Sequence, residues 1–365
     1  MIMKIIIAGG GTGGHIFPAV AIANAVQRLY AGTEVLFIGA LGKMEMEKVP
    51  QAGYKIIGLD IAGLNRSNWL KNISLPFKLW KSRKKAKEII REFQPDVVIG
   101  VGGFASYPML SAAQALGIPT LIQEQNSFAG KSNKRLGAKA KAICVAYDNM
   151  KQFFPEQAII QTGNPVRAVI ARSDVSKVQG LEAFGISSEK QTLLIVGGSL
   201  GAKAINEAIA AGLQTLVDAG LQIIWQTGVP FYGEALTAAA PHAENVKVHA
   251  FIKNMETAYA AADIVISRAG ALAIAELCIV AKPVIYVPYP FAAEDHQTSN
   301  AMSLVNKDAA WMVKNENAAK ELVPKLLELM NESGTQAVMH NNLKKLAVND
   351  ADERIARIIK SIAKS

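Results

Sequence analysis

The chain has 365 residues, of which 50% are hydrophobic, and its 39 Lys or Arg against 30 Asp or Glu give a formal net charge of +9. This length and hydrophobic content predict about two domains with ample cores, and they exclude a disordered chain, a collagen and a small disulfide scaffold. All of the basic excess lies in residues 1–163, which hold 20 basic and 10 acidic side chains. A charge field confined to one half of the chain indicates an anionic partner, either nucleic acid or an anionic membrane surface.

Cys144 and Cys278 each lie in an apolar run, which is typical of small buried hydrophobic residues in a reducing cytoplasm, and they show no metal-ligand spacing. The apolar run before Gly9 is too short for a signal peptide, and no stretch reaches the ~18 apolar residues of a membrane span. We therefore expect any membrane contact to be peripheral.

Short β-branched runs bounded by glycine alternate with helical patterns along the chain, which predicts parallel sheets covered on both faces. The series appears twice, on either side of a Gly/Pro break at 162–167, so we expect two doubly wound α/β domains. Their expected bounds are 1–163 and 164–342, with a helical segment at about 343–365 packing back on the first domain. The expected strands cover 4–10, 34–39, 54–59, 96–103, 120–125 and 142–147, then 192–198, 221–228, 246–251, 263–270 and 282–288.

The first expected strand leads into a glycine-rich loop, Gly9–Gly14, and then into His15 and an apolar helical pattern. Such a loop offers backbone amides and a helix N-terminus to a phosphate. A dinucleotide site is disfavoured because the second strand, which ends in EVLFIGALG, lacks the acidic residue that such a site needs. His15 is either a helix-capping or merely exposed residue, or a general base at the mouth of the loop.

Residues 66–91 hold nine basic side chains against one acidic side chain, and Trp69, Phe77 and Trp80 recur among them at near-helical spacing. This pattern predicts an amphipathic helix whose apolar face is either domain core or a peripheral membrane surface. Two tryptophans beside a dense cationic cluster favour the membrane, and no recognised nucleic-acid motif accompanies them. The basic residues expected at the membrane are Lys81, Arg83, Lys84 and Lys85.

A glycine-rich loop also follows the first strand of the second half, at 197–201, and it contains Ser199. This segment indicates either a second anion-binding loop or the nucleophile elbow of an α/β-hydrolase. We favour anion binding because a parallel loop recurs at 102–106. The hydrolase triad would be completed by His296 and either Asp263 or Asp295.

A third strand–turn–helix element spans 267–276, where Arg268 could bind a phosphate and Glu276 a ribose diol. For a lone helical Glu, the solvated surface position is the commoner alternative. The segment 295–297 follows a Pro-rich loop and has the polar density of a sugar-binding site.

These segments together carry a more specific signal than any one loop. Through GGGTGGHIFP (9–18), QEQN (123–126), TGNPVR (162–167), GGSLGA (197–202), SRAGALAIAE (267–276) and DHQ (295–297), the chain closely resembles the MurG family. These are bacterial UDP-N-acetylglucosamine–N-acetylmuramyl-(pentapeptide) pyrophosphoryl-undecaprenol N-acetylglucosamine transferases. The resemblance implies a GT-B fold, in which two Rossmann-like domains face a cleft. It also implies inverting transfer of GlcNAc from UDP-GlcNAc to the MurNAc 4-hydroxyl of lipid I at the cytoplasmic membrane face, which gives lipid II for peptidoglycan, without a cofactor.

The resemblance assigns roles residue by residue. His15 is implied to be the general base, Tyr107 and Glu124 are weaker acceptor contacts, and Ile252 matches the position whose backbone binds uracil. The other positions implied to bind UDP-GlcNAc are Thr12, Gly13, Gly14, Asn126, Arg167, Ser199, Arg268, Gly270, Ala271, Leu272, Ala273, Glu276 and Gln297.

Two other hypotheses stay open at this point. A related GT-B enzyme with another lipid acceptor, such as diacylglycerol, would share these loops. A module that binds a nucleotide sugar or nucleic acid without turnover would keep the basic cluster and need no base at position 15.

Overall fold

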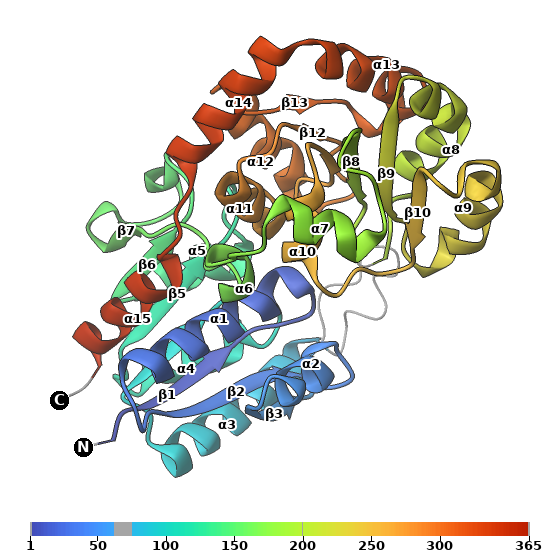
Figure 1. Cartoon of the computed structure of the whole chain (residues 1–365). Coiled ribbons are helices and arrows are strands. Elements are labelled where there is room, and N and C mark those ends of the chain that lie inside the picture. The colour runs from blue at the N-terminus through green and yellow to red at the C-terminus, as the bar shows by residue number, and fades with distance from the viewer. Residues whose placement is uncertain (1, 62–74, 199, 364–365) are drawn as a thin grey trace. The chain divides into compact units, whose positions relative to one another are not determined.

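The computed structural model describes residues 2–61, 75–198 and 200–363. It divides into two compact units, shown in Figure 1: unit 1 is Met1–Arg167 with Asp350–Ser365, and unit 2 is Ala168–Asn349. Each unit is built on one sheet in which all strand pairs are parallel. Over the described ranges, no helix has the length and apolar character needed to cross a membrane.

Unit 1 has a seven-stranded sheet in the order β3-β2-β1-β4-β5-β6-β7. The strands are β1 Lys4–Ala8, β2 Glu34–Ala40, β3 Lys55–Leu59, β4 Val97–Gly100, β5 Thr120–Glu124, β6 Ala142–Val145 and β7 Ile159–Gln161. The helices are α1 Gly13–Leu29, α2 Glu45–Gln51, α3 Leu75–Phe93, α4 Ser106–Ala115, α5 Lys131–Gly137 and α15 Ala351–Ile362.

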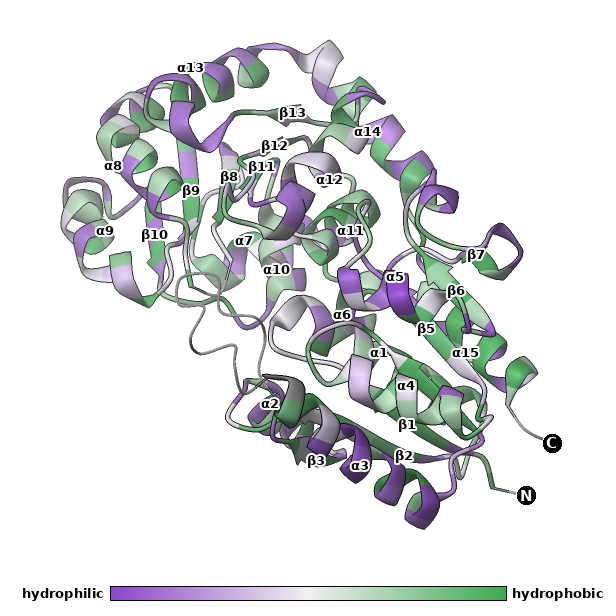
Figure 2. Ribbon diagram, turned by 180° about the vertical axis from the view of Figure 1, so that it is seen from behind, coloured by the Kyte–Doolittle hydropathy of each residue, from purple (hydrophilic) through white to green (hydrophobic). Residues whose placement is uncertain are grey.

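The apolar strands of unit 1 bury side chains on both faces, as β1 shows. Ile6 lies in a core with α3 and α4, whereas Ile5 and Ile7 lie in a second core with α1 and α15. Successive side chains of a strand point to opposite faces, so a sheet covered twice needs strands that are apolar at every position. In Figure 2 the central strands of unit 1 are accordingly green, while α3 is largely purple.

Unit 2 has a six-stranded sheet in the order β10-β9-β8-β11-β12-β13. The strands are β8 Gln191–Val196, β9 Leu221–Gln226, β10 Val246–His249, β11 Ile264–Ser267, β12 Val284–Tyr286 and β13 Trp311–Met312. The helices are α6 Ala168–Ala171, α7 Lys177–Phe184, α8 Lys203–Asp218, α9 Tyr232–Ala239, α10 Met255–Ala261, α11 Ala271–Val280, α12 His296–Val305, α13 Ala318–Asn331 and α14 Ser333–Leu346.

The structure differs from the sequence-based expectation at the edges of both sheets. β7 and β13 are edge strands of three and two residues, and runs this short show no periodicity to detect. The unit boundary follows Arg167 rather than Gly163. The returning segment starts at Asp350 rather than near Leu343, because Leu343 is buried in α14, and α14 packs on α11 within unit 2.

Helix α15 is part of the unit 1 core although it ends the chain. Its Ile355 and Ile359 are fully buried against α1. Arg28 of α1 donates to Asp352 Oδ2 and to Glu353 Oε1, both at 3.1 Å. Apolar burial supplies most of this contact, since a partly exposed ion pair stabilises little.

Both cysteines are buried, as the sequence predicts. Burial raises the pKa of each thiol to about 12: Cys144 in β6 and Cys278 in α11. Neither thiol forms an appreciable amount of thiolate at neutral pH, so both are packing residues.

Replacing Ile355 by Ala tests the role of α15. We expect the free energy of unfolding to fall by about 2–5 kcal/mol, because the change opens a cavity under α1. Urea unfolding followed by circular dichroism measures this, with the exposed neighbour Arg357→Ala as control. Equal stability of the two variants would show that α15 is not part of the core.

Candidate functional site

The glycine-rich loops lie at the points where the strand order of each sheet reverses. In unit 1 the reversal falls between β1 and β4, which are followed by the loops at 9–12 and 101–105. In unit 2 it falls between β8 and β11, which are followed by 197–202 and 268–270. Open parallel sheets bind ligands at the carboxyl ends of their strands at such switch points. Each unit therefore places its glycine loops where a ligand site is expected.

The two loops of unit 1 touch backbone to backbone. The Gly10 N–H donates to the Gly102 carbonyl at 3.2 Å. A Cβ at Gly103 would lie 2.2 Å from the Gly10 carbonyl oxygen, and one at Gly9 would lie 2.6 Å from the Gly102 carbonyl oxygen. Any side chain at these positions would separate the loops, so their glycines are required by contact and not only by turn conformation.

His15 lies in the first turn of α1 and is held by the glycine loop. Its Nδ1 lies 3.0 Å from the Gly10 carbonyl oxygen and 3.4 Å from Thr12 Oγ1. A carbonyl oxygen only accepts, so Nδ1 carries the proton and the lone pair of the neutral ring is on Nε2. A Cβ at Gly102 would lie 2.8 Å from Nε2, so this glycine keeps side-chain atoms away from the basic nitrogen. The ring is half-buried and bonded to the loop, so His15 is not merely an exposed residue. Its implied role as the general base stays a prediction.

The QEQN segment is a polar network at the end of β5. Glu124 is buried, and its carboxylate accepts from the Asn126 N–H at 3.1 Å, the Gly130 N–H at 3.0 Å and Asn133 Nδ2 at 2.8 Å. These bonds fix the loop that carries Asn126. The implied acceptor contact of Glu124 stays a prediction, and what the structure gives this residue is a positioning role.

Asn164 joins the QEQN segment to the TGNPVR segment. It accepts from Gln123 Nε2 at 3.0 Å and donates to the Gln125 carbonyl at 2.9 Å. Gln125 Nε2 in turn donates to the Val101 carbonyl at 2.8 Å, in the loop after β4. The carboxyl ends of β4 and β5 and the segment after β7 are therefore one hydrogen-bonded assembly.

Arg167 also lies beside the first glycine loop. Its guanidinium is 5.7 Å from the ring centroid of Phe17, and Phe17 packs next to Gly13 in α1. Tyr107 lies at the start of α4, partly buried against the core on the α3 side of the sheet. Unit 1 thus gathers Thr12, Gly13, Gly14, His15 and Arg167 at the carboxyl end of β1.

In unit 2, Gln226 at the end of β9 joins two loops. Its Nε2 donates to the Gly198 carbonyl at 3.2 Å, and its Oε1 accepts from the Ile252 N–H at 2.8 Å. The side chain of Ile252 is buried, so this residue is fixed both by packing and by its N–H. Ser199 lies outside the described residues, and its implied role stays a prediction.

Arg268 organises the neighbouring loop. Its Nη1 lies within 3.0 Å of the carbonyl oxygens of Val287 and Pro288 and of Asn315 Oδ1. Burial lowers the pKa of this guanidinium to about 10. Gln297 Oε1 accepts from the Tyr289 N–H at 3.0 Å in the same loop. Two residues expected to contact the donor therefore also hold the loop after β12.

Helix α11 carries the remaining residues expected to contact the donor. Gly270 is its N-cap residue, and Ala271, Leu272 and Ala273 form its first turn, where amide groups point out of the helix end. Glu276 is buried, and its Oε2 accepts from Tyr259 Oη of α10 at 3.0 Å. The alternative of a solvated surface carboxylate is therefore wrong for Glu276.

The hydrolase alternative with Asp263 is also wrong. Asp263 precedes β11 and thus lies at the amino edge of the sheet, whereas the loop at 197–202 follows β8 at the carboxyl edge. Its Oδ1 is 2.5 Å from Lys177 Nζ, and its Oδ2 accepts from the Thr192 N–H at 2.9 Å. Asp295 accepts from Thr298 Oγ1 at 2.7 Å.

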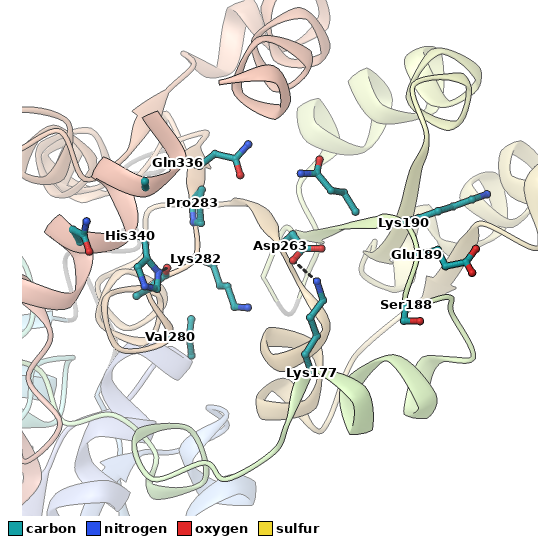
Figure 3. Close-up of a pocket in the computed structure, with 14 residues that line it drawn as sticks. Lys177, Ser188, Glu189, Lys190, Asp263, Val280, Lys282, Pro283, Gln336 and His340 are labelled. Carbon is teal, nitrogen blue, oxygen red and sulfur yellow. Dashed lines mark hydrogen bonds and ion pairs between the residues drawn. The ribbon is translucent and has the colours of Figure 1, made fainter. Parts of the chain in front are cut away.

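Asp263 instead lines a cavity of about 740 Å³, shown in Figure 3 with Lys177, Lys282 and His340. Burial lowers the pKa of Lys282, and the nearby Asp263 carboxylate opposes that shift. No residue of the expected site lines this cavity.

Sequence reasoning missed several residues that hold the site. Gln226 and Tyr259 are ordinary members of a strand and a helix, and Glu45 follows the second strand by five residues without a motif. The chain also contains an Asp-x-Asp pair, Asp350 and Asp352, away from the glycine loops. Its carboxylates bind Arg354 at 2.9 Å and Arg28 at 3.1 Å, at the start of α15.

Two parallel Rossmann-like sheets, each with a glycine-rich loop at its switch point, together with the matches below, place the chain in the GT-B class of glycosyltransferases. The N-terminal domain model of glycosyltransferase family 28 matches residues 5–145, and the C-terminal domain model matches 192–355.

Curated relatives and a solved structure cover nearly the whole chain. A protein of Phocaeicola vulgatus is 50% identical over 99% of this chain and 96% of its own length, and one of Cytophaga hutchinsonii is 53% identical over 96% and 95%. The crystal structure of MurG from Acinetobacter baumannii superposes with a TM-score of 0.79 at 30% identity, covering 98% of this chain and 99% of that one. The chain belongs to the family of both curated relatives, the UDP-N-acetylglucosamine–N-acetylmuramyl-(pentapeptide) pyrophosphoryl-undecaprenol N-acetylglucosamine transferases.

Replacing Gln226 by Ala tests its bridging role. The change leaves the Gly198 carbonyl and the Ile252 N–H without their partner, so we expect the free energy of unfolding to fall by about 1–3 kcal/mol. Urea unfolding measures the loss, and hydrogen exchange should rise at residues 251–254. The matched control is Gln214→Ala, since Gln214 bonds only within the exposed face of α8. Unchanged stability and exchange would contradict the bridge.

Proposed function

We propose that this chain transfers GlcNAc from UDP-GlcNAc to the MurNAc 4-hydroxyl of lipid I and so forms lipid II for peptidoglycan, with inversion at the anomeric carbon. The observation that carries the proposal is about 50% identity to proteins named for this transfer, over nearly the full chain. The roles of individual residues rest on the geometry described above.

The acceptor side of the reaction is assigned to unit 1. Nε2 of His15 takes the proton of the 4-hydroxyl as its oxygen attacks the anomeric carbon from the face opposite the leaving group. The bond between that carbon and the diphosphate oxygen breaks, its electron pair leaves with UDP, and the proton remains on His15. The bond between Nδ1 and the Gly10 carbonyl holds the lone pair on Nε2 until this nitrogen takes the proton.

The donor side is assigned to unit 2. The Ile252 N–H donates to Gln226, so we assign the Ile252 carbonyl oxygen to uracil. Glu276, oriented by Tyr259, accepts from the ribose. The amides of the first turn of α11 and of the loop containing Ser199 stabilise the diphosphate as negative charge develops on it. We propose that these helix N-termini act without a cofactor.

A helical surface on unit 1 is assigned to the membrane. In α3, Ala86, Ile89 and Ile90 are buried in the core, but Phe77 and Trp80 are 66% and 62% exposed. Their rings stack with centroids 6.1 Å apart, one helical turn from exposed lysines. The interpretation of the amphipathic pattern as domain core therefore holds for the second half of the helix. The membrane interpretation is proposed for the first half, where the aromatic rings are exposed.

Exposed aromatic rings beside basic side chains suit the interface of an anionic bilayer, which also holds a polyprenyl-linked acceptor. We therefore propose peripheral attachment to the cytoplasmic face of the cell membrane through Phe77, Trp80, Lys81, Arg83, Lys84 and Lys85. Trp69, which the sequence analysis adds to this surface, lies outside the described residues.

His15→Ala tests the base. We expect kcat for transfer from UDP-GlcNAc to a lipid I analogue to fall about 10²- to 10⁴-fold, because the general base is lost. The KM for UDP-GlcNAc should change little, since His15 acts on the acceptor hydroxyl and most of the expected donor contacts lie in unit 2. His242→Ala, in a short helical turn away from the loops, is the control. A wild-type rate in the His15→Ala protein would refute the assignment of His15 as the base. If the wild-type protein transferred label to diacylglycerol and not to lipid I, the acceptor would be diacylglycerol instead.

The double substitution Lys84→Glu with Lys85→Glu tests membrane attachment. Each basic side chain near an anionic surface contributes about 1 kcal/mol, so two reversals should weaken vesicle binding by at least roughly 30-fold. Co-sedimentation with vesicles containing anionic phospholipid measures this. The matched control reverses the exposed pair Lys344 and Lys345 of α14. Equal binding by both double variants would refute the α3 surface.

A further inference from the structure

A buried carboxylate touches the first glycine loop from outside the motif. Glu45 begins α2, and it is only 2% exposed. Glu47, two residues later on the same helix, has a side chain that is 66% exposed and pairs with Lys48. The burial of Glu45 is therefore not a property of the helix surface but of this one position. A buried carboxylate is costly unless it is hydrogen-bonded, so its partners indicate what it does.

The partners of Glu45 are backbone amides of the loop that follows β1 and of the last residue of β2. Its Oε2 accepts from the Gly11 N–H at 2.7 Å, and its Oε1 accepts from the Ala40 N–H at 3.0 Å. The Glu45 side chain fits here because two of the residues beside it are glycines. A Cβ at Gly10 would lie 2.2 Å from its carboxyl carbon, and one at Gly39 would lie 2.5 Å from its Cγ.

The peptide unit between Gly10 and Gly11 joins this carboxylate to the imidazole of His15. The N–H of that peptide unit donates to Glu45 Oε2, and its carbonyl oxygen accepts from His15 Nδ1 at 3.0 Å. A carboxylate on the N–H side increases the negative charge on the carbonyl oxygen, because hydrogen bonds in a chain polarise one another. A more strongly accepting carbonyl holds the proton on Nδ1, and this fixes the ring orientation and keeps the lone pair on Nε2.

We propose that Glu45 is a positioning residue for His15, acting through the Gly10–Gly11 peptide unit as an outer-shell carboxylate that selects the Nδ1–H tautomer. The inference rests on the proposed function, in which Nε2 of His15 is the base. Glu45 itself touches no substrate in this proposal. Its effect is on the orientation and basicity of the imidazole.

Glu45→Gln separates this role from packing. Glutamine keeps the shape of the side chain, but its amide oxygen can accept from only one of the two N–H groups. We expect kcat to fall about 10- to 100-fold, as for other outer-shell partners of a functional histidine, with the KM for UDP-GlcNAc changed by less than about 3-fold. The ¹⁵N signals of His15 should shift from the Nδ1–H tautomer towards a mixture with the Nε2–H tautomer. Glu47→Gln is the matched control and should leave the rate and both ¹⁵N signals unchanged.

The outcomes separate this inference from the proposed function. A folded Glu45→Gln protein with the wild-type rate, or with a reduced rate and an unchanged His15 tautomer, overturns the positioning role. An unchanged rate in the His15→Ala protein instead overturns the base assignment. If circular dichroism shows that Glu45→Gln does not fold, Glu45→Asp decides by the same two measurements. Its carboxylate is one methylene shorter, keeps the charge and is expected to lose contact with one amide, so an intermediate tautomer shift supports the role and no shift overturns it.

Discussion

The direct contact between the backbones of Gly9–Gly10 and Gly102–Gly103 is the constraint on which the unit 1 site depends. Because the facing residues are glycines, the loops after β1 and β4 approach to backbone hydrogen-bonding distance, and no side chain fits between them. That contact fixes the Gly10 carbonyl oxygen, which in turn fixes the tautomer and orientation of His15. It also leaves the Nε2 edge of the ring facing a position without a side chain.

Buried or half-buried polar side chains hold the loops of both units in place. Glu45 and Glu124 accept backbone N–H groups in unit 1, and Gln226 and Arg268 bind backbone groups in unit 2. Each is costly to bury, and each has its hydrogen bonds satisfied by the loops that it joins. Loops fixed in this way present their amides to an anion with little reorganisation. This is the condition under which backbone donors stabilise charge that develops on a leaving diphosphate.

The location of the basic residues is more informative than the net charge of the chain. The basic excess of the first half is concentrated in and just before α3, where the core-facing turns are apolar and the exposed turns carry two aromatic rings among lysines. A helix that only covered the sheet would not need those rings. This combination agrees with the proposed lipid surface as the anionic partner. A nucleic-acid partner has less support, because no recognised nucleic-acid motif accompanies the basic cluster.

The sequence by itself determined the parallel α/β fold, the repetition of the sheet unit, the glycine loops and the family, because these depend on local periodicity and on short motifs in a fixed order. It also identified His15 and Glu276 as residues of interest. Only the tertiary structure decided that Glu276 is buried, that Asp263 lies at the opposite edge of its sheet, and that Glu45 touches the first loop. A carboxylate looks the same in a sequence whether it is solvated or enclosed. Its partners are set by strand order, which brings together residues that are far apart along the chain.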